Sequence, residues 1–160
     1  MVPQNKEFPG FKHNEVELPK LERYENSYGE RFYENESGKK YISVTSVLNA
    51  WPKPWLEKWE ESIGKDKAEE IRQDAIAFGI GTHAAAEDIL HNMAPNFLYH
   101  DHFLAARSLI SQIINSVSLG EILGVEKSVF SDKIDVAGTI DLVAYSENLS
   151  KPELTVFDFK

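Results

Sequence analysis

The chain has 160 residues, 42% of them apolar and 27% charged, a composition typical of one globular domain with a hydrophobic core. It contains no cysteine, which excludes disulfides, thiolate nucleophiles and sulfur-bound metal centres, so any metal must be held by oxygen and imidazole ligands. The formal net charge of −9 is unfavourable for binding nucleic acid unless a local basic groove or bound cations reverse the field.

The first part of the chain predicts an extended arm, a hairpin and a short helix. Residues 1–30 are polar, contain three prolines and show no sustained period, so we expect an extended N-terminal arm. Residues 31–44 carry two β-prone runs around a Ser-Gly-Lys-Lys turn, which predicts a β-hairpin. The stretch SVTSVLNAW that follows is expected to be a short helix that begins at a hydroxyl cap.

The middle of the chain is predicted to be helical. Residues 52–79 indicate helix, with Pro54 in the first turn and a break at Gly64. A separate helix is expected from about Thr82 to Pro95. Residues 102–117 predict an amphipathic helix, whose apolar stripe consists of Phe103, Leu104, Ala106, Leu109, Ile110, Ile113 and Ile114.

The last part is rich in β-forming residues, and strands are expected within residues 121–132, 133–146 and 153–160. Because helices precede a run of strands, we expect an α/β protein of α+β-like order built around a mixed sheet. Residues 31–160 contain no repeat and no second domain boundary, so they are expected to form one domain.

Two aspartates, Asp141 and Asp158, lie in the two apolar runs that close the chain. If these runs form a hairpin in which Tyr145 pairs with Leu154, the two carboxylates lie directly opposite each other on one face. Like charges in that position repel, so a shared proton, a nearby cationic side chain or a metal must compensate. A solvated hairpin also carries polar residues on one face, but these runs are too apolar for that alternative and favour the mouth of a partly buried cleft.

Further polar residues of the chain can join these aspartates. Lys160 lies on the same strand face as Asp158, whereas Phe159 between them points to the core. His83 and Glu87 are four residues apart and share a helix face, which is also the spacing of an ordinary surface pair. Glu126 in GVEKSVF precedes a strand and either faces the same cleft or is solvated beside its neighbouring lysine.

Four stretches occur in a fixed order, GTHAAAE, VEKSVF, AGTIDLVA and VFDFK. Together they resemble the RecB-like branch of the PD-(D/E)XK nucleases, which includes the mitochondrial genome maintenance exonucleases and related phage and bacterial exonucleases. The upstream stretch YISVTSVLNAWPKPWLEKW is similar to the segment before the histidine motif in that group. The resemblance covers residues 31–160 and implies a restriction-endonuclease-like fold, with a central mixed sheet flanked by helices.

The resemblance also implies roles for individual residues. Asp141 matches the first metal-binding aspartate, and Asp158 and Lys160 match the acid and the lysine of the (D/E)XK triplet. The carbonyl of Phe159 would be a backbone ligand of the metal, which would be Mg²⁺ or Mn²⁺. Finally, His83 matches the histidine that reaches the metal. Glu87 would support this histidine, and Glu126 matches the family pattern less securely.

The function implied is a metal-dependent DNA exonuclease that hydrolyses phosphodiester bonds at single-stranded or processed ends in DNA replication, recombination or repair. Its partners would be DNA and replication or recombination proteins, in the cytoplasm of a bacterial or phage-infected cell. The family continues past the lysine, so we expect a C-terminally truncated nuclease domain. The alternatives are a catalytically silent nuclease-fold module that binds DNA or serves in assembly, and a structure-specific endonuclease.

Candidate DNA contacts lie near residue 50. Trp51, Trp55 and Trp59 recur every four residues beside Lys53 and Lys58, a pattern that could stack bases and contact phosphates. We favour the alternative that the tryptophans pack the helix onto the sheet, because large aromatic side chains dominate protein cores. Two hydroxyls could donate to a phosphate or cap the following helix, those of Thr45 and Ser46.

Overall fold

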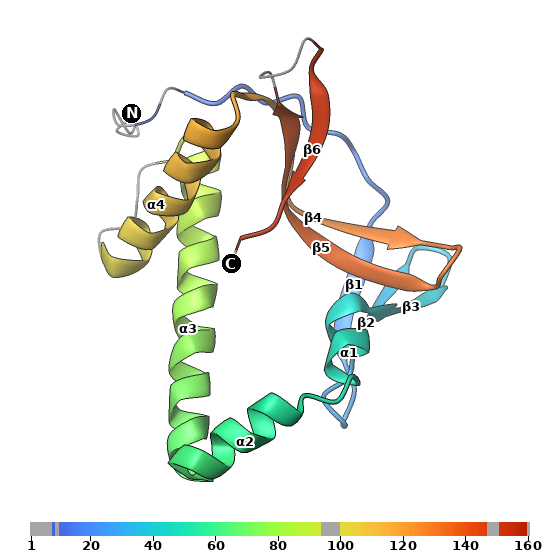
Figure 1. The fold of residues 1–160 in the computed structure, drawn as a ribbon. Coiled ribbons are helices and arrows are strands. Elements are labelled where there is room, and N and C mark those ends of the chain that lie inside the picture. The colour runs from blue at the N-terminus through green and yellow to red at the C-terminus, as the bar shows by residue number, and fades with distance from the viewer. Residues whose placement is uncertain (1–7, 9, 94–99, 147–150, 160) are drawn as a thin grey trace.

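A computed structural model describes residues 8, 10–93, 100–146 and 151–159 (Figure 1). These residues form a mixed α/β fold in which helices flank an open, mixed sheet of six strands. The elements in chain order are β1 (Leu21–Glu25), β2 (Arg31–Asn35), β3 (Lys40–Ser43), α1 (Val44–Asn49), α2 (Pro54–Ile63), α3 (Lys65–Leu90), α4 (His100–Ser116), β4 (Leu119–Ser131), β5 (Val136–Ser146) and β6 (Glu153–Phe157). The expected mixed sheet, with helices before the closing strands, is confirmed.

The strand β5 pairs with three other strands. β4 pairs antiparallel with one edge of β5 along most of its length. On the other edge β3 pairs parallel with the beginning of β5, and β6 pairs antiparallel with its end. The pairing with β3 ends at Ala137 and the pairing with β6 begins at Leu142, so Asp141 lies where β5 passes from one partner to the next.

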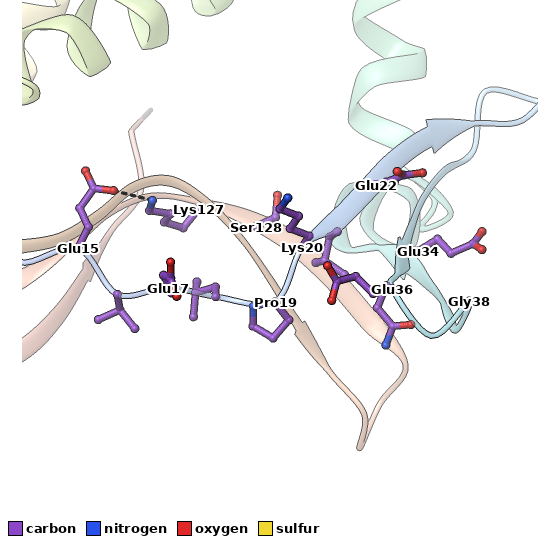
Figure 2. Close-up of a pocket in the computed structure, with 14 residues that line it drawn as sticks. Glu15, Glu17, Pro19, Lys20, Glu22, Glu34, Glu36, Gly38, Lys127 and Ser128 are labelled. Atoms are coloured by element: carbon purple, nitrogen blue, oxygen red, sulfur yellow. Dashed lines mark hydrogen bonds and ion pairs between the residues drawn. The ribbon is translucent and has the colours of Figure 1, made fainter.

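The expected hairpin is confirmed as β2 and β3, but the arm is shorter than the predicted residues 1–30. Leu21–Glu25 forms β1 at the outer edge of the sheet, where Tyr24 stacks on Phe32 of β2. A cross-strand aromatic pair of this kind stabilises an edge strand despite its polar neighbours. Before β1, residues 10–20 are extended, and Figure 2 shows Glu15, Glu17 and Pro19 beside Lys127 of β4.

The beginnings of the first two helices follow the sequence signals. Ser43 caps α1, since its Oγ accepts a hydrogen bond from the Thr45 N–H at 3.2 Å. Pro54 is the first residue of α2, and Gly64, with φ at 86°, separates α2 from α3 as expected. Ser46 holds α1 against β2, because its Oγ accepts the Arg31 N–H at 2.8 Å.

The helix break expected before Thr82 is wrong. α3 continues from Lys65 to Leu90 through Gly79 and Gly81, although each glycine costs about 1 kcal/mol relative to alanine. A Cβ at Gly81 would lie 2.7 Å from the ring of His102 on α4, so glycine is what lets the two helices approach there. The helix ends before Pro95, which lies outside the described residues.

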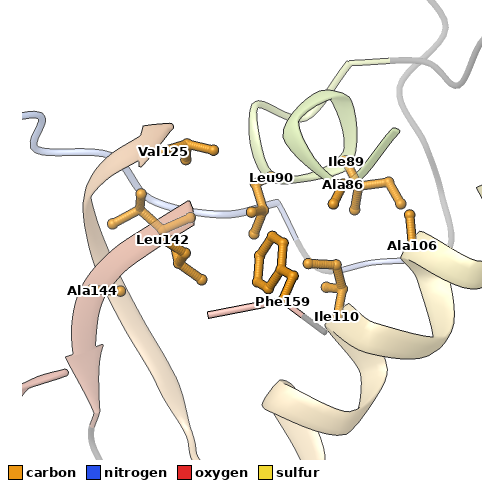
Figure 3. Packing of buried hydrophobic residues seen from close by; sticks show 10 residues of the cluster. Ala86, Ile89, Leu90, Ala106, Ile110, Val125, Leu142, Ala144 and Phe159 are labelled. Atoms are coloured by element: carbon orange, nitrogen blue, oxygen red, sulfur yellow. The ribbon is translucent and has the colours of Figure 1, made fainter. Parts of the chain in front are cut away.

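The main core lies between α3, α4 and the sheet (Figure 3). Phe159, which follows β6, is buried in it against Leu90, Ile110 and Leu142, so the expectation that Phe159 points inward is confirmed. The α4 stripe is confirmed except at Leu104, which is exposed. The buried or partly buried members are Phe103, Ala106, Leu109, Ile110, Ile113 and Ile114. Within the described ranges, every helix falls short of the length or apolar content that crossing a bilayer requires.

Candidate metal site

Three ionisable side chains from three elements converge beside the main core. His83 of α3 places Nδ1 3.4 Å from Oε1 of Glu126 on β4 and 3.5 Å from Oδ1 of Asp141 on β5. One ligand atom from each residue lies within 4.8 Å of the other two. Two carboxylates and one imidazole gathered at this spacing can hold a divalent ion.

The strand pairing places the two carboxylates side by side. Val125 lies opposite Leu142 and Lys127 lies opposite Ile140, so Glu126 and Asp141 occupy the gap between these pairs, and their carboxylates lie close together. Directly opposed side chains have Cβ atoms about 5 Å apart, which brings like charges into contact range. The pairing of β4 with β5 therefore brings two carboxylates together in the folded chain.

Glu126 also has an unusual backbone. Its φ is 50°, in the left-handed region that side chains larger than glycine rarely adopt, and it lies in the interior of a 13-residue strand. A conformation of this kind costs on the order of 1–3 kcal/mol and persists where the surroundings enforce it, often at functional sites. Here it accompanies the approach of the Glu126 carboxylate to His83.

Asp141 is held rigidly. Only 8% of the residue is exposed, and its Oδ2 accepts a hydrogen bond of 2.6 Å from the backbone N–H of Phe159. The Phe159 ring lies 5.7 Å from the His83 ring, so one buried residue fixes both the carboxylate and the imidazole beside it. Oδ1 is left to face His83.

The electrostatics of the site are those of a cation site. Burial raises the pKa of the Glu126 carboxyl above its ordinary value; the hydrogen bond to His83 opposes this rise, and the charge of Asp141 adds to it. A divalent ion between the carboxylates would remove the repulsion and favour both ionised forms. The donor set of one imidazole nitrogen and two carboxylate oxygens fits Mn²⁺, and it fits Mg²⁺ through its oxygens.

The structure confirms the strand register predicted for Asp158. Tyr145 pairs with Leu154 and Leu142 pairs with Phe157, and the pairing ends there, so Asp158 lies one residue past the end of β6. Asp158 is exposed, and among the described residues the group within 4.8 Å comprises His83, Glu126 and Asp141 without it. Lys160 lies outside the described residues, so its role stays a prediction.

The other predicted residues lie outside the group of His83, Glu126 and Asp141. Glu87 lies one turn further along α3, with its Oε1 4.0 Å from Nε2 of His91, and its support of His83 stays a prediction. The proposed packing of the tryptophans is wrong for Trp51 and Trp55, which are 78% and 68% exposed. Lys53 donates to Asn49 Oδ1 at 2.9 Å, and Thr45 and Lys58 are exposed.

Comparison of the chain with protein-family models, curated proteins and solved structures gives no match. The chemistry of the site therefore rests on its own geometry. Glu126 was expected to precede a strand, whereas β4 extends from Leu119 to Ser131 and includes this residue. The signal that identifies it is the β4–β5 register, which is a property of two segments and not of one motif.

Proposed function

We propose that the protein is a metal-dependent deoxyribonuclease with a restriction-endonuclease-like fold, of the PD-(D/E)XK class. The observation that carries this proposal is the convergence of His83 of α3 with Glu126 and Asp141, which lie on two neighbouring strands of a mixed sheet. Support comes from the sequence order of the four motifs, each of which contributes a residue at or next to the site. An exonuclease that acts on single-stranded or processed DNA ends is the activity we favour.

In this proposal His83, Glu126 and Asp141 hold Mg²⁺ or Mn²⁺. The ion would supply Lewis-acid polarisation of the phosphodiester and acidify the attacking water. The chain itself orients the ligands: the Phe159 N–H fixes Asp141, and the strand pairing fixes Glu126 beside it. Asp158, one residue past the end of β6, would contact the ion or the water from the exposed side, and Lys160 would stabilise the developing negative charge.

The exposed tryptophans support a nucleic-acid partner. Trp51 and Trp55 present large apolar rings to solvent near Lys53 and Lys58, which is the combination that stacks bases and contacts phosphates. Thr45 adds an exposed hydroxyl on α1, whereas Ser46 is bonded to the backbone of Arg31. Replication or recombination proteins would be further partners of an enzyme that processes DNA ends.

The position of Asp158 favours one second candidate. Because the ligand group assembles without its carboxylate, a catalytically silent module that binds metal and DNA would have the same geometry. The two candidates differ in a single observable, which is cleavage of the phosphodiester bond. A structure-specific endonuclease differs from the exonuclease only in the substrate that is cut.

The deciding experiment is digestion of end-labelled linear and closed circular DNA in Mg²⁺ or Mn²⁺, with Asp141→Asn, Asp158→Asn and Lys160→Ala as test variants. Glu22→Gln on β1 is the control matched to Asp158→Asn, because it also removes one exposed acid but lies on an outer strand. We expect the wild type and the control to degrade linear DNA and Asp141→Asn to be inactive.

Each other result has a definite meaning. Cleavage of circular DNA that survives in the control but not in Asp141→Asn would identify an endonuclease. A wild type that binds the metal and DNA without cutting would identify the silent module. Digestion unchanged in Asp141→Asn would show that this site is not the catalytic one.

A further inference from the structure

A second histidine–carboxylate group lies two turns further along α3, away from the site described above. It joins His13 and Glu15 of the N-terminal arm to His91, which caps the C-terminal end of α3. One ligand atom from each of these residues lies within 4.8 Å of the other two. His83 and His91 are eight residues apart, or about 12 Å along the helix axis, so the two groups are separate.

The arm is fixed where it carries these ligands. The Ile122 N–H donates to the Lys12 carbonyl at 2.8 Å and the Asn14 N–H donates to the Ile122 carbonyl at 2.8 Å. At the end of α3, Asn92 accepts the Phe11 N–H at 2.7 Å through its side chain. The arm is therefore extended at this point, and residues two apart on it, such as His13 and Glu15, face the same way.

The distances fit a bound transition metal. Glu15 Oε1 lies 3.6 Å from Nδ1 of His13 and 3.8 Å from Nδ1 of His91. Two ligands that each bind zinc at about 2.0–2.1 Å in tetrahedral geometry are about 3.3 Å apart. The observed separations exceed this value by only a few tenths of an ångström, which side-chain rotation can close.

The hydrogen bonding of His13 points the same way. Its Nε2 lies 2.8 Å from the Leu90 carbonyl oxygen, which can only accept, so Nε2 carries the proton. In the neutral ring Nδ1 is then a lone pair, and it is buried with no hydrogen-bond partner in the described part of the chain. This lone pair faces the acceptor Glu15 Oε1, so the two atoms attract each other only through a proton on Nδ1 or a cation bound between them.

The two carboxylate oxygens of Glu15 face different partners. Its Oε2 accepts from Lys127 Nζ at 2.7 Å, the contact drawn as a dashed line in Figure 2, and Oε1 is left to the histidines. The rings of His13 and His91 are stacked, with centroids 5.4 Å apart and an angle of 14° between their planes. A ligating histidine that donates its other N–H to a backbone carbonyl, beside a hydrogen-bonded carboxylate, is the usual surrounding of a protein metal site.

We propose that His13, Glu15 and His91 form a binding site for a divalent transition metal of the Zn²⁺ type, which fastens the N-terminal arm to the end of α3. Two imidazoles and one carboxylate are a common three-ligand set for zinc, with a fourth position left to solvent. Magnesium is excluded from this role because it prefers all-oxygen surroundings. The proposal is independent of the nuclease assignment.

The test is a zinc titration of metal-free protein against a chromophoric chelator, in buffer with excess Mg²⁺ to occupy the other site. We expect one tight Zn²⁺ per chain in the wild type. Glu15→Gln and His91→Ala should each weaken this binding by at least about tenfold. Glu17→Gln, an exposed acid two residues along the same arm, and His83→Ala in the other group should leave it unchanged.

A second measurement covers the case in which His91→Ala disturbs folding. Tryptic cleavage after Lys12 should slow on adding Zn²⁺ in the wild type and in Glu17→Gln, and should not respond in Glu15→Gln. No tight zinc binding by the wild type would overturn the proposal. It would equally be overturned by binding that survives in Glu15→Gln and His91→Ala and is lost in His83→Ala, since zinc would then occupy the first group.

Discussion

The two histidine–carboxylate groups on α3 differ in how they are built. The group at His83 has one imidazole and two carboxylates, lies against the main core and draws on the left-handed backbone of Glu126. The group at His91 has two imidazoles and one carboxylate, and two of its members come from an extended arm at the surface. One helix thus carries both an oxygen-rich and a nitrogen-rich group.

The two groups are suited to different ions. Opposed carboxylates and a strained residue destabilise the metal-free fold, and a bound cation would offset this cost. Two imidazoles, one from the arm and one from the end of α3, carry no such penalty beside a single carboxylate and suit a structural ion. The two groups should therefore differ in metal preference, in their effect on activity and in their effect on stability.

The largest effect is expected from Asp141→Asn. This change removes the buried carboxylate charge and keeps the side-chain volume, so DNA cleavage should fall by about 10²–10³-fold. Zinc binding at His13, Glu15 and His91 should stay as in the wild type. Rates of Mg²⁺-dependent DNA digestion and a zinc titration on the same preparation check both statements, and a coupled loss of the two would contradict the separation of the groups.

The next largest effect is stabilisation by zinc. An ion that binds only the folded chain adds about 2.7 kcal/mol to the free energy of unfolding at 100 times its dissociation constant. For a chain of this size that corresponds to a rise of about 5–10 °C in Tm. Thermal unfolding with and without Zn²⁺ should show this rise in the wild type and in Glu17→Gln. A similar rise in Glu15→Gln would place the ion elsewhere.

Glu126→Gly should separate stability from activity. Glycine adopts a φ of 50° without strain, and the change removes one of two opposed charges, so metal-free protein should gain about 1 kcal/mol and 2–4 °C in Tm. Glu126→Gln removes the charge and keeps the strain, so its gain should be smaller. Both variants should lose metal-dependent cleavage. Thermal unfolding without metal gives the order, and a fall in Tm for Glu126→Gly would show that the side chain is needed for packing.

The smallest effect is a pH dependence that comes from the same residue. Because burial raises the pKa of Glu126 in the folded state, the folded chain holds this proton more tightly than the unfolded chain. This contribution to stability is complete below the ordinary pKa of 4.5 and is lost as the pH rises through the raised folded-state value. The Tm difference between metal-free Glu126→Gln and wild type should therefore widen as the pH rises above 4.5. A constant difference would contradict the raised pKa.

The closing strands could be predicted from sequence, because two runs of β-forming residues lie either side of a polar loop. Their register was an assumption, the pairing of Tyr145 with Leu154, and the structure has that pair. The apolar stripe of α4 could also be predicted, because a helix face that packs on a core must be apolar at helical spacing. Local pattern and tertiary structure agree in these elements.

The failures have a common cause, which is contact between distant segments. A separate helix was expected from about Thr82, but α3 is continuous there, and the approach of His102 from α4 leaves no room for a Cβ at Gly81. Glu126 was the least secure residue of the site because its alignment with Asp141 depends on the β4–β5 register. The group of His13, Glu15 and His91 could not be predicted, because it joins residues up to 78 positions apart that follow no ligand spacing.

Phe159 links the packing of the core to the position of the Asp141 carboxylate. Its ring completes the packing between the helices and the sheet, and its amide holds the carboxylate of Asp141. The pre-organised carboxylate can exist only after the segment following β6 has docked onto the interior. Divalent-ion affinity at that carboxylate would thus report, during refolding, the moment at which the last piece of the interior is in place.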